Sequence, residues 1–339
     1  METMKLKRKS IMSIQELTRE ELEGMVEYMA ALKSPSSKEN LAGKTLLTLL
    51  LTPDIHTRLE MGIAASQLNM QNITMDCTRE KWEIRWESGE MIFGNNAEHV
   101  RDVARILERH GDYVAVRHVP YSGNWQVDRQ DSVIKSLEQN IRIPVYNLGS
   151  CLFCPTQGMA DLFTIKTKLK TLVGWKAVVA WTQHAGMEPM GPPNSFALAA
   201  SKFGMDLTIA CPEAYDLDPA ILKFLQKNVK NHGGSFEVSR DLSKAIKGAH
   251  LVYAANWQSI KYYDKPDEEK EARKNLSDWM VRGELMEKTD GGYFMHPVPI
   301  KRNVSVTDQI LDGNTCLAYD QAENRVHALK AFLLSTMQG

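Results

Sequence analysis

Short apolar runs alternate with amphipathic segments along almost the whole of this 339-residue chain. Residues 45–51 read as a buried strand, and residues 97–110 place valine, alanine and leucine on one face of a helix. The second half repeats the pattern, with strand-like runs at 175–181, 207–211 and 250–254. Strands that alternate with helices build βαβ units and parallel sheets. The sequence therefore predicts an α/β fold, and its length is typical of about two domains.

Four further segments carry structural predictions. Residues 18–21 form a capping-box pattern that opens a helix, and residues 157–170 predict a long helix that bridges the two halves. Three prolines and two glycines within residues 184–194 predict a rigid, irregular loop, with a helix beginning only at its end. A loop of this length and rigidity suggests a function. The charge run at 264–274 predicts a solvated loop or helix face.

Charge and composition exclude several classes of protein. The chain has 41 lysines and arginines against 42 aspartates and glutamates, so its net charge of −1 gives no reason to expect binding to nucleic acid. The richest apolar run is far shorter than the ~20 residues that cross a bilayer, and no signal peptide is evident. Five cysteines are few and odd in number for a disulfide framework. We therefore expect a cytoplasmic protein with free thiols that binds neither membrane nor nucleic acid.

Several common catalytic motifs are absent from the sequence. It contains no Gly-x-Gly-x-x-Gly after a strand, no Walker loop, no His-Glu-x-x-His and no Gly-x-Ser-x-Gly. Cys151 and Cys154 are spaced as in a thioredoxin-type redox motif, but the surrounding order of strands does not fit that fold. A zinc site would need two more ligands at matching spacing, and Cys77 and Cys211 are isolated. We expect no metal and no cofactor.

Candidate ligand-binding residues are scattered along the chain, at the predicted ends of strands and starts of helices. Thr57 and Arg58 open a predicted helix, where a hydroxyl, a guanidinium and free N–H groups can hold an anion or a polarised carbonyl. Arg117 ends a predicted strand, the place where α/β sheets carry ligand groups. His296 follows another strand, and Arg325 lies at the start of the last helix. Taken singly, each residue is better explained by a structural role.

Taken in order, from about residue 40 to residue 335, these segments resemble the carbamoyltransferase family. The resemblance is to its N-acetylornithine and N-succinylornithine branch. The family's Ser-x-Arg-Thr-Arg phosphate loop is similar to residues 54–58, and its His-Pro-x-Gln motif to residues 154–157. Its Gly-Val-Arg strand end resembles residues 115–117, and its Ala-Glu-Asn-Arg motif is intact at 322–325.

Three more segments carry the same resemblance. The family's tryptophan-containing loop, which reaches the site of a neighbouring subunit, looks like the sequence around Trp82. The Pro-rich loop of the branch is similar to residues 184–194, and the His-Cys-Leu-Pro motif to residues 296–299. The resemblance therefore spans both halves of the chain.

This resemblance implies two doubly wound parallel-sheet domains, the second with a trefoil knot, in a homotrimer. Residues 1–150 would bind the carbamoyl donor, joined by the C-terminal helix 321–339, and residues 151–320 would bind the amino acid. The implied reaction is attack by the amine of an amino acid, such as an N-acylated ornithine, on the carbonyl of a carbamoyl-type donor. The implied partners are small-molecule substrates.

The resemblance also assigns roles to single residues. Four would be catalytic, because they hold or polarise the carbonyl: Arg117, Thr57, Gln157 and His296. Five would bind substrate on the donor side: Asp54, His56, Arg58, Trp82 and Cys154. Four would bind it on the amino-acid side: His184, Asn194, Lys301 and Arg325.

Three donor-side residues depart from the family motifs. Asp54 stands in place of the phosphate-binding serine, His56 in place of an arginine, and Cys154 in place of the carbonyl-polarising histidine. A carboxylate at 4 Å from a phosphate charge costs about 1–4 kcal/mol per charge pair. The sequence therefore predicts weak binding of carbamoyl phosphate. Two alternatives stay open: a same-fold enzyme with a non-phosphate donor, and a non-catalytic paralogue that binds an amino acid.

Overall fold

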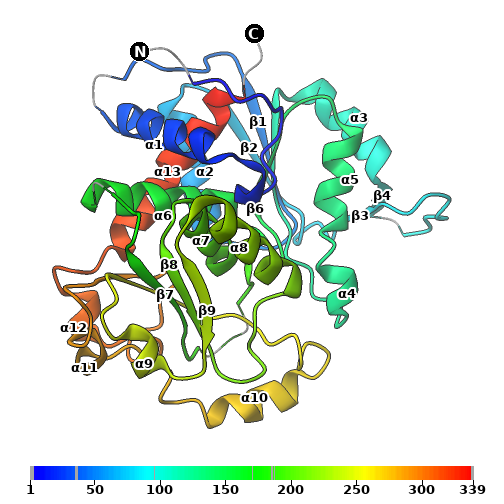
Figure 1. The fold of residues 1–339 in the computed structure, drawn as a ribbon. Coiled ribbons are helices and arrows are strands. Elements are labelled where there is room, and N and C mark those ends of the chain that lie inside the picture. The colour runs from blue at the N-terminus through cyan, green and yellow to red at the C-terminus, as the bar shows by residue number, and fades with distance from the viewer. Residues whose placement is uncertain are drawn as a thin grey trace. The chain divides into compact units, whose positions relative to one another are not determined.

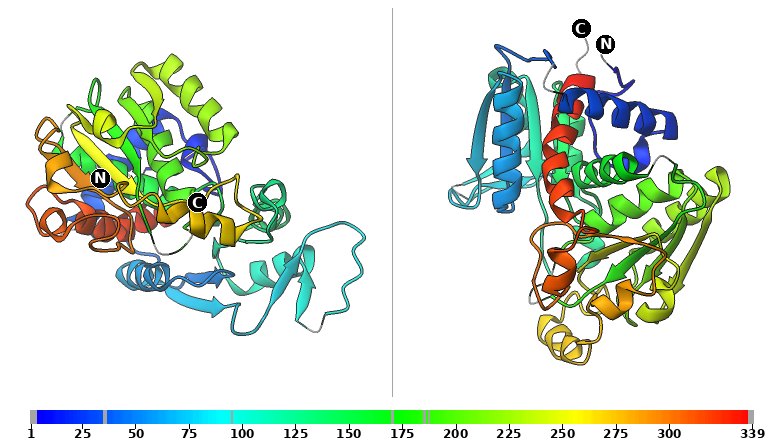
Figure 2. Two further views of the ribbon diagram at one scale, coloured as in Figure 1. Left: turned by 90° about the horizontal axis from the view of Figure 1, so that it is seen from below. Right: turned by 90° about the vertical axis from the view of Figure 1, so that its left-hand side faces the viewer.

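The computed structural model describes residues 4–34, 37–94, 96–169, 171–184, 186 and 188–336. Parts of three predicted segments lie outside these residues: Lys170, Ala185, Met187 and residues 337–339. The chain divides into two compact units, drawn in Figures 1 and 2. Unit 1 comprises residues 1–121, 126–156 and 325–339, and unit 2 comprises residues 122–125 and 157–324.

Unit 1 is built on a parallel sheet that has four strands within the described part of the chain, in the order β2-β1-β5-β6. These strands are β1 (Thr45–Leu50), β2 (Gln71–Asp76), β5 (Tyr113–Arg117) and β6 (Val145–Gly149). The central strands β1 and β5 are almost wholly buried, which explains why both read as apolar runs. β2 lies at the edge, is only partly buried and is rich in polar residues, so the sequence pattern missed it.

Helices cover both faces of this sheet (Figure 1). Those of unit 1 are α1 (Arg19–Lys33), α2 (Ile55–Gln67), α3 (Val100–His110) and α5 (Ser132–Asn140), with η1 (Ile14–Glu16) near the N-terminus. Helices α3 and α5 pack against one face through Val103, Leu107 and Leu137, and α2 lies on the other. The predicted capping box at the start of α1 is confirmed, because Thr18 and Glu21 exchange hydrogen bonds. The short strands β3 (Glu83–Arg85) and β4 (Ala97–His99) pair beside this core.

Three helices contain a boundary between the units. They are α4 (Trp125–Asp128), α6 (Pro155–Lys168) and α13 (Ala318–Ser335). Helix α6 begins in unit 1 and continues in unit 2 from Gln157, whereas α13 begins in unit 2 and continues in unit 1 from Arg325. The described helices include none that is long and apolar enough to cross a membrane.

Unit 2 is built on a second parallel sheet, whose described residues form five strands in the order β11-β10-β7-β8-β9. They are β7 (Lys176–Trp181), β8 (Asp206–Ala210), β9 (Ser235–Ser239), β10 (Leu251–Ala255) and β11 (Tyr293–Met295). The helices are α7 (Gly191–Lys202), α8 (Pro219–His232), α9 (Leu242–Ile246), α10 (Pro266–Lys274), α11 (Gly283–Met286) and α12 (Asp308–Leu311). Phe196 of α7 stacks on Tyr253 of β10 with ring centroids 4.2 Å apart, whereas α9 and α12 join a cluster with Val178 and Val252.

Three predictions about local structure need correction. Helix α7 begins at Gly191, because Pro192 and Pro193 fit the first turn of a helix, where no N–H donor is needed. Residues 97–99 pair as a strand, and the helix begins only at Val100. The charge run 264–274 is not uniformly solvated, since Glu269 and Arg273 of α10 are buried.

Candidate functional site

In both units the candidate residues follow the carboxyl ends of parallel strands, where an α/β sheet forms its ligand crevice. In unit 1, β2 lies on one side of β1 and β5 on the other, so the topological switch point falls between β1 and β5. Asp54 and Thr57 follow β1, and Arg117 is the last residue of β5. The fold therefore brings together the donor-side residues that are separated in the sequence.

Asp54 occupies the N-terminus of α2. Its side chain accepts a hydrogen bond of 2.7 Å from the backbone N–H of Thr57, and its other oxygen lies 3.0 Å from Nη2 of Arg117. Burial by itself would raise the pKa of Asp54, but Arg117, the N–H of Thr57 and Arg325 together lower it. The carboxylate is therefore ionised at neutral pH and held between a helix N-terminus and an arginine.

The Arg117 guanidinium depends on the residue opposite it in the sheet. Gly149 pairs with Arg117 in register, and a Cβ at Gly149 would overlap with Nη1 of Arg117. Only glycine leaves room for the guanidinium in this position. The carbonyl of Arg117 accepts hydrogen bonds from the N–H groups of Leu51 and Thr52 at 3.0 and 3.3 Å, which ties the loop after β1 to the end of β5.

Arg325, which the sequence assigned to the amino-acid side, lies among the donor-side residues of unit 1. Its Nε donates to both carboxylate oxygens of Glu60 at 2.8 Å, and its Nη1 lies 3.9 Å from the sulfur of Cys154. Both side chains are buried, and burial raises the pKa of Glu60 although Arg325 opposes this effect. Although burial opposes the effect, Glu60 raises the pKa of Arg325. Sequence reasoning missed Glu60. The sequence indicates it only as an acidic residue on the buried side of an amphipathic helix.

Arg58 and Trp82 line a cavity of about 520 Å³ at the carboxyl end of β2. Arg58 pairs with Asp76 at 3.1 Å. The Trp82 indole N–H donates to Glu98 at 3.1 Å, and the ring packs in part against the core of its own unit. Trp82 thus has partners within its own unit, whereas the resemblance implies that it reaches a neighbouring subunit. His56 is half-buried in the first turn of α2.

Cys151 and Cys154 lack the properties of a redox pair. All five cysteines of the chain are described and free, and these two are buried. Burial raises the pKa of Cys151, whereas a redox motif needs a lowered thiol pKa. The sulfur of Cys154 lies 3.4 Å from the carbonyl of Leu148. Within the described ranges, no group of three histidine, cysteine or acidic side chains is placed to hold a metal ion.

The amino-acid-side candidates of unit 2 surround a second switch point. It falls between β7 and β10, because β8 and β9 lie on one side of β7, and β10 and β11 lie on the other. His184 follows β7 and His296 follows β11. Asn256, which sequence reasoning missed, follows β10 and donates to the carbonyl of Thr182 at 2.7 Å. This hydrogen bond ties the loop after β10 to the loop after β7.

His296 is a buried, neutral imidazole. Burial lowers its pKa to about 4. Its Nδ1 lies 2.6 Å from the carbonyl oxygen of Pro297, which can only accept, so Nδ1 carries the proton. Nε2 therefore presents a lone pair, and it has no hydrogen-bond partner among the described residues. This tautomer can accept a proton, but it cannot donate a hydrogen bond to a carbonyl oxygen as the resemblance implied.

His184 carries its proton on the other nitrogen. In the shorter of its two contacts with Gly186, Nδ1 accepts from the backbone N–H at 3.0 Å. Nε2 is then the donor, and it lies 3.6 Å from a carboxylate oxygen of Glu188. Burial, assisted by the positive charges of Lys301 and Arg273, lowers the pKa of His184. Unit 2 thus offers one imidazole donor and one imidazole acceptor at the carboxyl edge of its sheet.

A buried chain of hydrogen bonds links Gln157 to His296 within unit 2. The amides of Gln157 and Gln321 both donate to Oδ1 of Asp161, at 2.6 and 2.7 Å. The amide oxygen of Gln321 accepts the backbone N–H of His296 at 2.9 Å. Sequence reasoning missed Asp161 and Gln321. The available signal was the spacing of Asp161, four residues after Gln157 on the same helix face.

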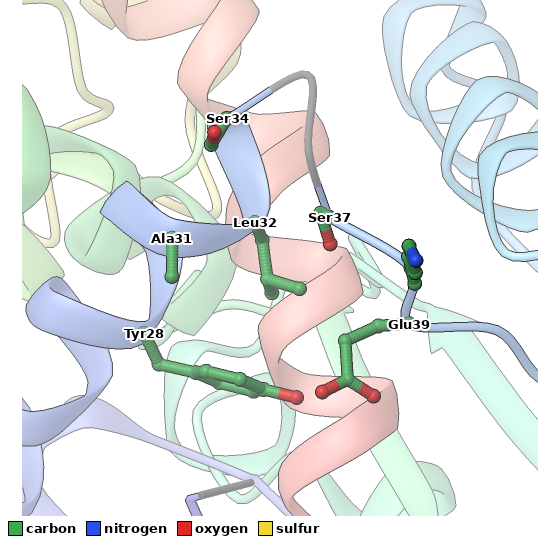
Figure 3. A pocket seen from close by; sticks show the side chains of 7 residues that line it. Tyr28, Ala31, Leu32, Ser34, Ser37 and Glu39 are labelled. Atoms are coloured by element: carbon green, nitrogen blue, oxygen red, sulfur yellow. The ribbon is translucent and has the colours of Figure 1, made fainter. Parts of the chain in front are cut away.

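The remaining amino-acid-side candidates differ in exposure. Asn194 is buried in the first turn of α7 rather than in a loop, whereas Lys301 is exposed. A cavity elsewhere in unit 1, of about 550 Å³, contains none of the candidate residues (Figure 3). It opens beside α1, with the polar ends of Tyr28 and Glu39 turned toward each other. We assign it no function.

Comparison with known families matches two domain models to successive parts of the chain. Residues 9–167 match the carbamoyl-P binding domain of aspartate/ornithine carbamoyltransferase, and residues 193–336 match its Asp/Orn binding domain. The chain belongs to this carbamoyltransferase family. It is accordingly a transferase of the carbamoyltransferase type. The predicted family is confirmed, together with the two-unit α/β fold with parallel sheets.

Individual carbamoyltransferases resemble the chain over nearly its full length. N-acetylornithine carbamoyltransferase of Xanthomonas campestris is 32% identical over 328 residues, which cover 96% of each chain. N-succinylornithine carbamoyltransferase of Bacteroides fragilis is 30% identical over 282 residues, which cover 83% of this chain and 84% of the relative.

Solved carbamoyltransferase structures show the same fold. Acetylornithine transcarbamylase complexed with acetylcitrulline aligns with a TM-score of 0.94 at 31% identity, covering 98% of this chain and 100% of that one. A variant of N-acetyl-L-ornithine transcarbamylase, complexed with carbamyl phosphate and N-succinyl-L-norvaline, aligns with a TM-score of 0.94 at 32% identity. That alignment covers 97% of this chain and 100% of the other.

Proposed function

We propose that this carbamoyltransferase transfers a carbamoyl group to the side-chain amine of an N-acylated ornithine. Relatives named for N-acetylornithine and N-succinylornithine support the acceptor. The observation that carries the proposal is the buried, neutral His296, whose Nε2 lone pair follows β11 in the unit that matches the Asp/Orn binding domain. An amine becomes more acidic as its nitrogen bonds to a carbonyl carbon, so its proton can pass to the free Nε2 lone pair, although the low pKa of His296 makes it a weak base.

The other candidate residues divide between the two substrates. On the donor side, Thr57, Arg117 and the N-terminus of α2 hold the carbamoyl group. On the acceptor side, the donor Nε2 of His184 and the charge of Lys301 hold the carboxylate of the amino acid. Gln157 is oriented by Asp161 and assists at the carbonyl. No metal or cofactor enters this scheme.

We extend the proposal to the assembly and its setting. Ile55, Leu59 and Ile63 are spaced four residues apart on α2 and are 78%, 59% and 37% exposed, so they form an apolar stripe. A homotrimer buries such a stripe, and replacing Leu59 with lysine should then yield monomers in sedimentation experiments. The free cysteines support a cytoplasmic location. The trefoil knot in unit 2 rests only on the resemblance of residues 184–194 to the Pro-rich loop of the branch.

The test is a transfer assay with carbamoyl phosphate as donor and product detection by mass spectrometry. The acceptors are N-acetylornithine, N-succinylornithine, ornithine and aspartate. We expect a ureido product from an N-acylated ornithine, and at least a hundredfold loss of turnover in His296→Gln. The control is His110→Gln, on the exposed end of α3. Binding of the amino acid with no product from saturating carbamoyl phosphate, in the wild type and in Asp54→Asn alike, would instead favour the non-catalytic paralogue.

A further inference from the structure

Each of the three candidate arginines of unit 1 is already paired with a carboxylate of the same unit. The pairs are Arg58 with Asp76 at 3.1 Å, Arg117 with Asp54 at 3.0 Å and Arg325 with Glu60 at 2.8 Å. The charges of these groups cancel. A further cation, Arg79, lies 3.7 Å from Asp76, but its side chain is 80% exposed. The buried part of the donor side therefore lacks the excess positive charge that favours a bound phosphate dianion.

Asp54 takes the position in which an anion would bind. Helix α2 is 13 residues long, and its N-terminus at a switch point is a favourable place for negative charge. One oxygen of Asp54 already accepts the N–H of Thr57, and the other already pairs with Arg117. A bound dianion would have to displace this carboxylate or lie beside it, and like charges at such distances repel strongly.

The described buried donors of unit 1 that still lack a partner suit an uncharged acceptor oxygen. Nε of Arg117 and the hydroxyl of Thr156 are buried, and neither has a hydrogen-bond partner among the described residues. Both groups can donate a hydrogen bond. A carbonyl oxygen satisfies such donors without bringing further negative charge, whereas a dianion brings charge that the paired arginines no longer compensate.

We propose that Asp54 sets the charge of the donor that this site accepts. Its carboxylate fills the anion position, so the site disfavours carbamoyl phosphate and accepts a carbamoyl donor whose leaving group carries at most one negative charge. The identity of the transferred group rests on the proposed function. In the transfer, the amine nitrogen bonds to the carbamoyl carbon and the bond from that carbon to the leaving group breaks. The leaving group keeps the electron pair, and His296 accepts the amine proton.

The test measures anion binding by titration calorimetry on the full chain. Carbamoyl phosphate and inorganic phosphate are titrated separately into the wild type, Asp54→Asn and Asp54→Ser. Asparagine and serine both cap helix N-termini, so these variants keep α2 while they lose the charge. We expect both variants to bind each anion at least tenfold more tightly than the wild type, the effect of one charge pair near the surface. Asp102→Asn, on the exposed face of α3, removes the same charge and should bind as the wild type does.

The outcomes separate this inference from the proposed function. Equal affinity of the wild type and both Asp54 variants for carbamoyl phosphate overturns the inference and leaves Asp54 as a helix cap only. Calorimetry needs no acceptor, so the expected gain in affinity stands even if no N-acylated ornithine is a substrate. Conversely, efficient transfer from carbamoyl phosphate, with the same KM in the wild type and Asp54→Asn, supports the function and refutes the inference.

Discussion

Replacing Arg273 with methionine should strongly destabilise unit 2. The guanidinium is buried, and its Cζ lies 5.5 Å from the ring centroid of Trp181 and 5.6 Å from that of Tyr215. Its Nε and Nη2 donate to Glu269 at 3.1 and 2.7 Å, and its Nη1 donates to the carbonyl of Gly186 at 3.2 Å. The residue therefore anchors α10 and the loop after β7 at one point.

The magnitude follows from what the substitution leaves behind. Glu269 is 1% exposed, so loss of Arg273 leaves a buried carboxylate without its counter-charge. Removing one partner of a buried ion pair costs about 3–5 kcal/mol of unfolding free energy. Methionine fills much of the vacated apolar space, so the cavity term is small. The double variant Glu269→Leu, Arg273→Met should recover most of the loss, because no buried charge remains.

Urea unfolding followed by tryptophan fluorescence provides the assay. Five of the seven tryptophans belong to unit 2, and the other two, Trp82 and Trp86, belong to unit 1, so most of the signal reports on the affected unit. Lys270→Met, on the exposed side of α10, is the matched control and should change the unfolding free energy by less than about 0.5 kcal/mol. The reasoning is refuted if Arg273→Met lies within about 1 kcal/mol of this control, or if the double variant is as unstable as the single one.

Three further predictions concern single residues. Gly149→Ala should displace the Arg117 guanidinium and lower kcat/KM at least tenfold, whereas Gly62→Ala, whose added Cβ meets nothing within 4 Å, should not lower it. Because the folded-state pKa of His296 is about 4 against an ordinary 6.5, the unfolded chain binds a proton between these values that the folded protein does not bind. The unfolding free energy should therefore fall as pH is lowered from about 6.5 toward 4, and His296→Gln should show a smaller fall between pH 7 and pH 5 in urea titrations. Thr18→Ala should lower the unfolding free energy of unit 1 by about 1 kcal/mol, and Thr18→Ser should not, as measured by the same titrations.

The sequence by itself determined the fold class and the family of this protein. Strands that are buried on both faces of a parallel sheet are apolar over most of their length, so β1, β5 and β7 can be recognised in the sequence as apolar runs. The capping box of α1 is visible because its two partners lie within one helical turn. The motif residues at strand ends are recognisable because the carboxyl edge of a parallel sheet is where ligand-binding groups lie. Each of these signals is local in the chain.

The tertiary structure alone decided which charges meet. Glu60 and Arg325 are 265 residues apart, and no local pattern pairs them. Arg273 was hidden within a run of charged residues, because a pattern of charge does not show which face of a helix is buried. The contact of Asp54 with Arg117 joins the ends of two strands. The tautomer of His296 depends on how the backbone of the next residue, Pro297, is folded against the ring, and its low pKa depends on burial by the rest of the unit. Ionisation and hydrogen bonding depend on distance and burial, which exist only once the chain has folded.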